Sequence, residues 1–200
     1  AAIVPSNVPV GAEQLRVRFN GQTSNSINIQ IVKSSFGMFT LNQAGSGSGI
    51  FQNPVTFSVN SLQNPVAPGT LMDIWGTGLG PITAPDNQAP PIQNIDVPVT
   101  VKVGNMNADV VYKGRSACCA GIDQIRIRIP QVTGCYVPVV VIANGIPSNF
   151  TTMSVAPAGQ QCTDPGGFTS NEIQTINRGD IRLGVLNLGR MSMTQSVPGA

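Results

Sequence analysis

The sequence contains no histidine, few charged residues and few aromatic residues. Of its 200 residues, 11 are Lys or Arg and 9 are Asp or Glu, so charged residues make up 10% of the chain and the net charge is +2. Without histidine there is no Ser-His or Cys-His nucleophilic pair and no histidine ligand for a metal. A net charge this small gives no field that would attract nucleic acid or an anionic membrane. We therefore expect no nucleic-acid partner.

Long apolar runs are also missing. The mean hydropathy is slightly positive at +0.11, yet no apolar run approaches the roughly 20 residues that a membrane-spanning helix needs. Residues 1–3 do not begin a charged region followed by an apolar one, as a secretory signal would. We therefore expect no membrane span, and we interpret the chain as a mature or trimmed product.

The residues that are abundant favour short strands joined by turns. The chain contains 22 Gly and 16 Pro, which interrupt regular structure, and Val and Ile dominate its apolar residues. β-branched side chains favour strands, whereas Gly, Pro and Asn favour turns. The composition therefore predicts an all-β protein.

Apolar and polar side chains alternate along several segments with the period of two that is typical of a half-buried strand. In the first two predicted strands, at residues 14–19 and 26–32, the apolar face consists of Leu15, Val17, Phe19, Ile27, Ile29 and Ile31. Further strands are predicted at residues 56–60, 70–75, 97–103, 108–112, 123–129, 136–143 and 150–156. This number and spacing of short strands is typical of an Ig-like β-sandwich.

One segment occurs twice. VVVIANGIPSN at residues 139–149 is similar to LRVRFNGQTSN at residues 15–25, and the strands that follow, 150–156 and 26–32, also match. Asn-Gly between apolar runs is the strongest short-range signal for a β-hairpin. The separation is about the length of one Ig-like domain, so the pattern predicts one sandwich unit present once in full and once in part.

We therefore divide the chain into three parts. Residues 1–63 are predicted to be a partial Ig-like unit, residues 64–162 a complete sandwich, and residues 163–200 a short helix followed by a strand-like tail. A two-stranded hairpin is marginal alone in water, so the partial unit and the tail are expected to be completed by strand addition, within the chain or in a neighbour. The predicted interface consists of Leu15, Val17, Phe19, Ile27, Ile29, Ile31, Ile181, Leu183 and Val185.

Four cysteines lie in the second half of the chain: Cys118, Cys119, Cys135 and Cys162. An even number in a β-rich chain favours disulfides and an oxidising compartment. Zinc is the alternative, although adjacent cysteines fit a tetrahedral site poorly. Because a bridge between adjacent cysteines is strained, we expect Cys118 and Cys119 each to pair with Cys135 or Cys162, with Cys119–Cys135 and Cys118–Cys162 preferred.

Few residues suggest chemistry. The glycine-rich segment at 76–81 lacks phosphate-binding spacing and precedes a proline-rich loop, so it is interpreted as a strand leaving the sandwich through positive-φ glycines. Asp73 and Asp123 have no second acid near them in sequence, although a glycosidase needs two at a defined separation. The loop residues 86–96 carry Asp and Asn oxygens but no calcium-loop pattern. We predict no catalytic residue, no metal and no cofactor.

Trp75 and Tyr112 are the candidates for a ligand-binding platform. Trp75 lies on the face of its strand opposite Ile74, so it points either outward or inward beside Asp73. A lone Trp can stack on a sugar, but packing in a core or between domains is the favoured interpretation.

Four motifs together indicate a family resemblance. They are APGTLMDIWGTGLGP at 67–81, VPVTVKVGNMNADVVYKG at 97–114, CCAGIDQIRIRIP at 118–130 and GCYVPVVVIANGIPSN at 134–149. This pattern resembles an uncharacterised Ig-like repeat of large secreted proteins from Acidobacteria (Solibacter-type), and is similar to IPT/TIG domains. The resemblance covers residues 64–162 in full and implies an extracellular β-sandwich module without established enzymatic activity. The four cysteines fit a Cys-bearing subset of that family.

Two functions follow as expectations. The first is a non-enzymatic extracellular structural or adhesive module of the cell surface, acting as a filament subunit that assembles head-to-tail or with other Ig-like repeats by strand complementation. The second is a carbohydrate- or surface-ligand-binding module, accessory to a secreted enzyme, with a glycan as its partner.

Overall fold

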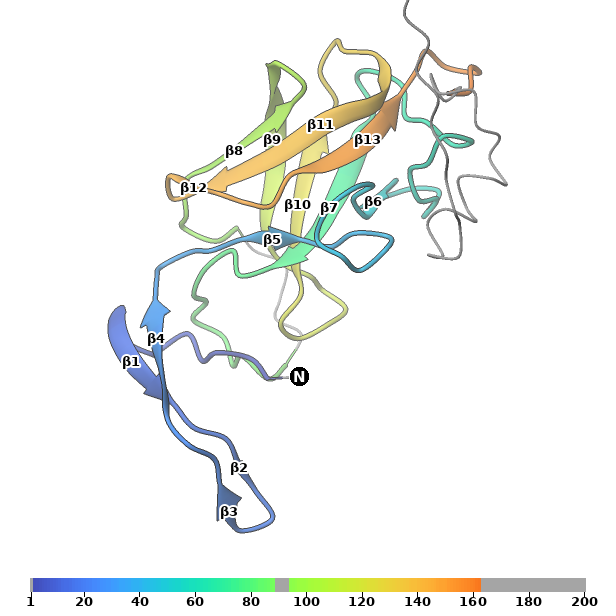
Figure 1. Cartoon of the computed structure of the whole chain (residues 1–200). Helices are drawn as coiled ribbons and strands as arrows, with labels where there is room; N and C mark the ends of the chain where they lie inside the picture. Colours follow the sequence, from blue (N-terminus) through green and yellow to red (C-terminus); the bar gives the residue numbers. More distant parts are fainter. Residues whose placement is uncertain (1, 89–93, 163–200) are drawn as a thin grey trace, which may run out of the picture.

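The computed structural model describes residues 2–88 and 94–162, where the regular structure consists of strands. Most strands lie in one body, and a long hairpin projects from it (Figure 1). The strands are β1 (Gly11–Leu15), β2 (Arg18–Phe19), β3 (Gln22–Thr23), β4 (Ile27–Ile31), β5 (Gly37–Met38), β6 (Phe51–Gln52), β7 (Leu71–Thr77), β8 (Val99–Val103), β9 (Met106–Arg115), β10 (Asp123–Arg128), β11 (Gly134–Ala143), β12 (Ile146–Pro147) and β13 (Thr151–Val155).

The strands of the body follow one hydrogen-bonded path that folds over into two layers. One layer has the order β5–β7–β10–β9, with β6 also paired to β7. The other layer contains β8 and β11, and β12 and β13 pair with β11. β9 joins the layers, because residues 106–108 pair with β8 whereas residues 109–115 pair with β10. In Figure 1, β11 and β13 cross over β7 and β10, so the body has the all-β, sandwich-like fold that the sequence predicts.

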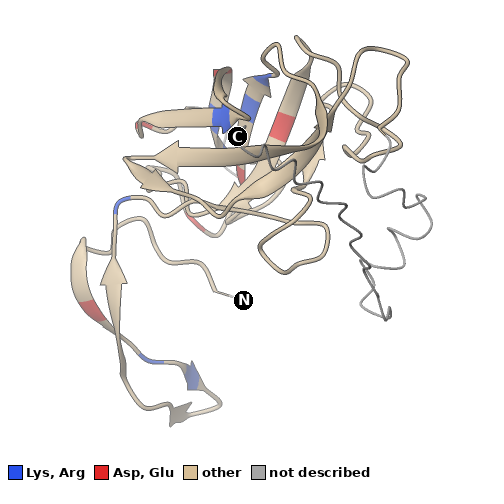
Figure 2. Ribbon diagram, turned by 45° about the horizontal axis from the view of Figure 1, so that its top comes forward, with Lys and Arg blue, Asp and Glu red and all other residues tan. Residues whose placement is uncertain are grey.

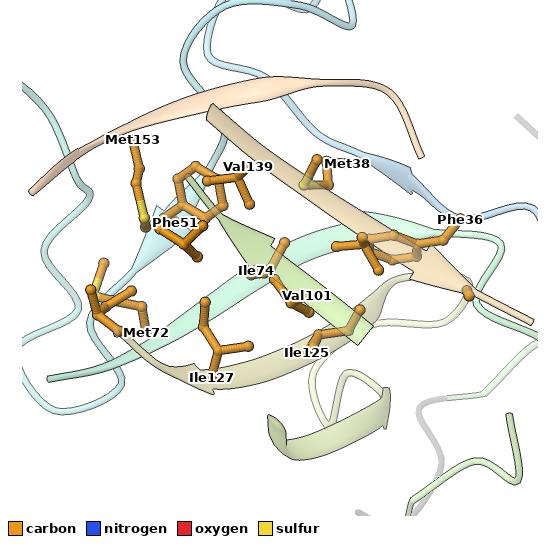
Figure 3. Close-up of a cluster of buried hydrophobic side chains, with 14 of the residues drawn as sticks. Phe36, Met38, Phe51, Met72, Ile74, Val101, Ile125, Ile127, Val139 and Met153 are labelled. Atoms are coloured by element: carbon orange, nitrogen blue, oxygen red, sulfur yellow. The ribbon is translucent and has the colours of Figure 1, made fainter. Parts of the chain in front are cut away.

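The facing sides of the two layers form one hydrophobic core (Figure 3). Side chains that are at most 2% exposed come from both layers: Met72, Ile74, Ile125 and Ile127 from β7 and β10, and Val101, Val139 and Met153 from β8, β11 and β13. Burial of each such side chain stabilises the fold by about 1.5–3 kcal/mol. The predicted alternation is confirmed on β10, where Ile125 and Ile127 are buried while Arg128 is exposed.

The segment before residue 64 also contributes to this core. Phe36, Met38 and Phe51 are at most 4% exposed and belong to the same cluster as the sandwich side chains. β5 and β6 place them there by pairing with β7. The core therefore runs across the boundary that the sequence pattern placed between residues 63 and 64, and the part that projects from the body is the shorter hairpin of β1–β4.

One predicted strand is wrong. Residues 56–60 turn instead of extending, because Asn53 Oδ1 accepts the backbone N–H groups of Val55 at 2.8 Å and Thr56 at 3.0 Å. Phe57 has a φ of 58°, and Val59 makes a single isolated bridge to Gln52. An Asn side chain that satisfies the backbone two residues ahead competes with strand pairing. The strands predicted from residue 70 to residue 156 are confirmed as β7, β8, β9, β10, β11 and β13.

Gly76 permits the close approach of β5 to β7. A Cβ built at Gly76 would lie 2.5 Å from Phe36 Cζ and closer still to the carbonyl oxygen of Gly37. Gly78 and Gly80 instead have positive φ angles of +86° and +151°, which confirms for these two the predicted exit from the strand. Gly76 is therefore required by packing alone, whereas Gly78 is required both by its backbone conformation and by packing, since a Cβ there would lie 2.4 Å from Ser35 O.

We expect Gly76→Ala to lower the free energy of unfolding by about 2–3 kcal/mol, because the new methyl group must displace the backbone of β5. Gly37→Ala is the matched control, since a Cβ there meets nothing within 4 Å. Urea denaturation of both variants checks this expectation. Equal midpoints for the two variants would contradict the packing argument.

Candidate functional site

The projecting hairpin is the candidate functional site. We define the arm as residues 11–32, in which β1 pairs with β4 and β2 pairs with β3. Within residues 2–88 and 94–162 no further strand pairs with these two ladders. Figure 1 shows the arm extending away from both layers of the body, and Figure 2 shows few charged residues along it.

The arm repeats the hydrogen bonds of the hairpin that completes the sandwich. The Val17 N–H donates to Ser24 Oγ at 3.0 Å, the Ser24 N–H donates to Val17 O at 2.9 Å, and the Ser24 hydroxyl donates to Asn25 O at 2.8 Å. The same three bonds, at 3.0, 2.7 and 2.8 Å, recur 124 positions later between Val141, Ser148 and Asn149. The duplication in the sequence is therefore a duplication of local structure.

The strand register and the turn agree as well. Leu15 faces Ile27 and Glu13 faces Ile29 across the arm. At the corresponding positions of the body, Val139 faces Thr151 and Val137 faces Met153. The two Asn-Gly turns have matching φ pairs, 47° and 77° at Asn20-Gly21 and 51° and 80° at Asn144-Gly145.

The corresponding side chains differ in burial. Val139, Val141 and Ala143 are 0% exposed, whereas Leu15, Val17 and Phe19 are 45%, 61% and 81% exposed. Ile27 is 51% exposed, and Ile29 and Ile31 are half-buried. The arm thus has the backbone of a sandwich hairpin without an opposing layer in the described part of the chain. Exposed apolar patches of this kind mark interaction surfaces.

One edge of the arm is also open. In the body, residues 139–143 of β11 pair with β8 along the edge opposite β13. In the arm, Val17 uses its N–H and C=O within the hairpin. Backbone groups of alternate residues point to opposite edges of a strand, so those of Arg16 and Arg18 face the open edge. The arm therefore offers both an apolar face and a strand edge.

Asn149 shows how a hairpin of this kind is fixed to the rest of a sandwich. Its Oδ1 accepts the Met38 N–H at 2.7 Å, and its Nδ2 donates to Met38 O at 3.0 Å and to Gly45 O at 2.8 Å. Asn25 occupies the corresponding position of the arm and is exposed. Asn25 therefore has the residue type and backbone setting for the same contact with a partner.

The segment that precedes the arm is bound to the body through Ser6. The Ser6 backbone N–H and hydroxyl donate to the Asp86 carboxylate at 2.7 and 2.6 Å, and the Ser6 hydroxyl accepts the Ile82 N–H at 2.9 Å. Arg115 lies 3.9 Å from Asp86 and forms an ion pair with the buried Asp123. This chain of polar contacts ties the base of the arm to the sandwich.

The pKa values of Asp86 and Asp123, the two carboxylates in this series of polar contacts, are shifted in opposite directions. Burial raises the pKa of Asp123, and the hydrogen bond from the Leu79 N–H and the charge of Arg115 offset this only in part. Burial also acts to raise the pKa of Asp86, but the hydrogen bonds from Ser6 and the charge of Arg115 outweigh it, so this pKa lies below its ordinary value. Sequence reasoning considered Asp86 only as a calcium ligand and missed Ser6, which carries no motif.

A cavity of about 370 Å³ lies between the base of the arm and the body. It is lined mostly by residues 2–10 and 30–35, with Arg115 and Gly121 on the side of the body. The guanidinium of Arg115 is already held by Asp123 and by Gly80 O, the latter at 3.2 Å. Ser6, Gln30 and Lys33 also line the cavity, so its walls combine apolar side chains with polar groups and one exposed ammonium group.

Trp75 and Tyr112 lie on the outer face of the body. Arg126 pairs across the sheet with both Asp73 and Tyr112, and Trp75, two positions beyond Asp73, shares that face. The Arg126 guanidinium holds the Asp73 carboxylate with two hydrogen bonds of 2.7 and 2.8 Å, and this contact raises the pKa of Arg126. The Tyr112 hydroxyl donates to Arg115 O at 2.6 Å. Both aromatic side chains are half-buried. The Asp73 carboxylate forms an ion pair with Arg126.

The cysteines pair differently from the sequence prediction. Cys118 forms a disulfide with Cys119, so the preferred pairs Cys119–Cys135 and Cys118–Cys162 are wrong. Cys135 and Cys162 are free thiols that are half-buried. The two cysteines lie in the turn between β9 and β10, where the Cys118 N–H donates to Ser116 Oγ at 3.1 Å and the Ile122 N–H donates to Cys119 O at 3.4 Å. Within the described residues, no group of three or more His, Cys, Asp or Glu side chains is arranged to hold a metal ion.

Comparisons with models of protein families, with curated proteins and with solved structures found no match to this chain. In the part of the chain that the structure describes, no helix is long and apolar enough to cross a membrane. The short helix predicted within residues 163–200 and the tail residues Ile181, Leu183 and Val185 lie outside the described residues.

Asn149→Ala should lower the free energy of unfolding by about 2 kcal/mol, because it leaves the backbone N–H and C=O of the buried residue Met38 without their partner and also removes a hydrogen bond to the exposed Gly45. Asn25→Ala, the same substitution in the arm, should leave the stability of the monomer unchanged within about 0.5 kcal/mol. Thermal denaturation of the two variants at low protein concentration checks this difference. Equal losses of stability would contradict the distinct roles assigned to the two asparagines.

The contribution of Asp86 should depend on pH. Its pKa is lowered in the folded protein, so its stabilisation is present above the unfolded value near 3.9 and is lost as the pH falls through the folded value. We expect Asp86→Asn to cost about 1 kcal/mol at pH 7 and progressively less below about pH 4. Urea denaturation of both proteins across this range measures the difference, and a cost that persists undiminished at pH 2 contradicts the assignment.

Proposed function

We propose that this protein is a non-enzymatic structural or adhesive module of the bacterial cell exterior that associates with further copies through its arm. The observation that carries the proposal is the pair of equivalent hairpins. One hairpin is covered on its face and along its edge by the sandwich, and the other repeats its hydrogen bonds and register with both surfaces exposed.

The exposed face supplies the driving force for association. Leu15, Val17, Phe19 and Ile27 are between 45% and 81% exposed, and full burial of a large apolar side chain is worth about 1.5–3 kcal/mol. Covering the remaining exposed half of four such side chains is therefore worth several kcal/mol. Arg16 and Arg18 alternate with Leu15, Val17 and Phe19 and therefore lie on the opposite face, whereas Glu13 shares the face of Leu15 at the end of the arm nearer the body.

The open edge supplies direction and register. An added strand that runs antiparallel to residues 15–19 would occupy the place that β8 takes beside β11 in the body. The arm is one surface and its acceptor is a different surface, so the contact is heterologous. A heterologous contact that does not close on itself builds a filament, and the partner segment expected from the sequence is the tail around Ile181, Leu183 and Val185 of a neighbouring copy.

An extracellular location is supported by the disulfide and by the family resemblance. A disulfide between Cys118 and Cys119 persists in oxidising compartments and is rare in the cytosol. The resemblance to Ig-like repeats of large secreted proteins suggests the same location. A low content of charged residues, 10% of the chain, suits a surface that packs against other β-structure.

Sedimentation velocity over a range of protein concentrations tests this function. The unmodified protein should form species larger than a monomer, and electron microscopy should show filaments. Val17→Glu with Phe19→Glu should abolish association, because two carboxylates would be buried on the contact face. Arg16→Gln with Arg18→Gln, on the polar face of the same strand, is the matched control and should still associate.

A second variant separates strand addition from loose apolar contact. Arg18→Pro removes a backbone N–H from the open edge and keeps the apolar face intact. Strand addition predicts at least a tenfold weaker association for this variant. Unmodified protein that stays monomeric at every concentration would refute the proposed function.

A further inference from the structure

Several chain segments converge at one end of the sandwich around Cys135 and Cys162. Gly134 pairs with Val155, and the ladder between β11 and β13 is irregular between Gly134 and Val137, so Cys135 lies in a bulge. Residues 135 and 136 of β11 lie opposite the single residue 154 of β13. A bulge of this kind changes the direction in which a side chain points. Cys135 is therefore not placed by the ordinary alternation of a strand.

Ser154 connects the two cysteines. Its hydroxyl donates to Cys135 O at 2.9 Å, and its side chain also forms a hydrogen bond with the Cys162 thiol. The backbone of Ser154 is fixed in turn by the carboxamide of Asn60, with two hydrogen bonds of 2.8 Å. The residue that contacts both cysteines is thus rigidly held.

Cys162 reaches this point because the chain returns to the sandwich after β13. The Cys162 N–H donates to Leu62 O at 3.0 Å, which fixes the backbone of the cysteine beside the body. Its thiol makes a side-chain hydrogen bond with Cys135. Burial and this contact raise the pKa of Cys162 to about 12, so the thiol is protonated at neutral pH.

We propose that Cys135 and Cys162 are a second disulfide site and form an intramolecular bond in the mature protein. The oxidant is an external disulfide of the glutathione or oxidoreductase type. One cysteine thiolate attacks the oxidant and forms a mixed disulfide, releasing one thiol of the oxidant. The second cysteine thiolate then displaces the other half, so two thiols of the protein lose two electrons and two protons and the oxidant gains them.

The bond would close a covalent loop that contains β12, β13 and the part of β11 after residue 135. Tension on the chain beyond residue 162 would then pass directly to β11 at residue 135 instead of peeling β13 away from β11. β13 carries the core residues Met153 and Val155, and it is a short strand of five residues. The proposed bond therefore adds a covalent link to the pairing of β13 with β11 and to its isolated bridges with Ser48 and Val66 on the other edge.

The test uses the full chain with Cys118→Ser and Cys119→Ser, so that Cys135 and Cys162 are the only thiols. The folded variant is equilibrated with oxidised glutathione, and remaining thiols are labelled with a maleimide-polyethylene glycol and counted on a non-reducing gel. We expect no label, a monomeric band, and a peptide cross-linked between residues 135 and 162 in the mass spectrum. Reduction should lower the thermal midpoint by about 5–10 °C.

Three outcomes would overturn the proposal: two labelled thiols, a stable glutathione adduct on either cysteine, or a disulfide-linked dimer. Adding Ser154→Ala separates proximity from misfolding, because this variant keeps both cysteines and removes the hydroxyl that contacts them. We expect it to form the bond more slowly but to completion. If it forms no bond while its circular dichroism spectrum is unchanged, the two sulfurs are not brought together as proposed.

Discussion

A β-hairpin in a sandwich buries its apolar face against an opposing layer, and an uncovered strand edge is a template for pairing with another strand. The structure of this protein depends on that constraint. The body satisfies it for β11 and β13, where β8 covers the edge and the layer of β7 and β10 covers the face. Val139, Val141 and Ala143 are fully buried as a result. The arm has the same backbone and does not meet the constraint within the described residues. The contrast between two nearly identical hairpins is the basis for the proposed association.

The arm is held to the body by polar contacts at its base, and its apolar face stays exposed. Ser6, Asp86, Arg115 and Asp123 form a chain of hydrogen bonds and ion pairs that runs from the N-terminal segment into the buried end of β10. A buried arginine between two carboxylates keeps its partners only in a fixed geometry, since any unpaired charge there would be costly. This arrangement fixes the segment that precedes the arm against the sandwich.

Sequence patterns predicted most of the fold because they record local requirements. Alternation predicted the buried face of β10, and the two Asn-Gly pairs identified both hairpin turns from their need for positive φ. The strand at residues 56–60 was wrong because the Asn53 side chain satisfies the backbone there, and alternation does not report side-chain competition. The contribution of Phe36, Met38 and Phe51 to the core was missed because their partners on β7 are distant in sequence. The sequence pattern identified the individual apolar residues of the arm, whereas it gave no indication that Ser6 would bind the body.

The amino-acid sequence alone determined the all-β class, the repeated hairpin and its register, because each of these follows from the side chains of neighbouring residues. Tertiary structure alone decided which copy of the hairpin is buried, which cysteines meet and how the arm is fastened. These depend on contacts between residues far apart in the chain, such as Asn149 with Met38 and Cys162 with Leu62. Burial is a property of what surrounds a residue, so two copies of one local pattern can have the same hydrogen bonds and opposite exposure to solvent.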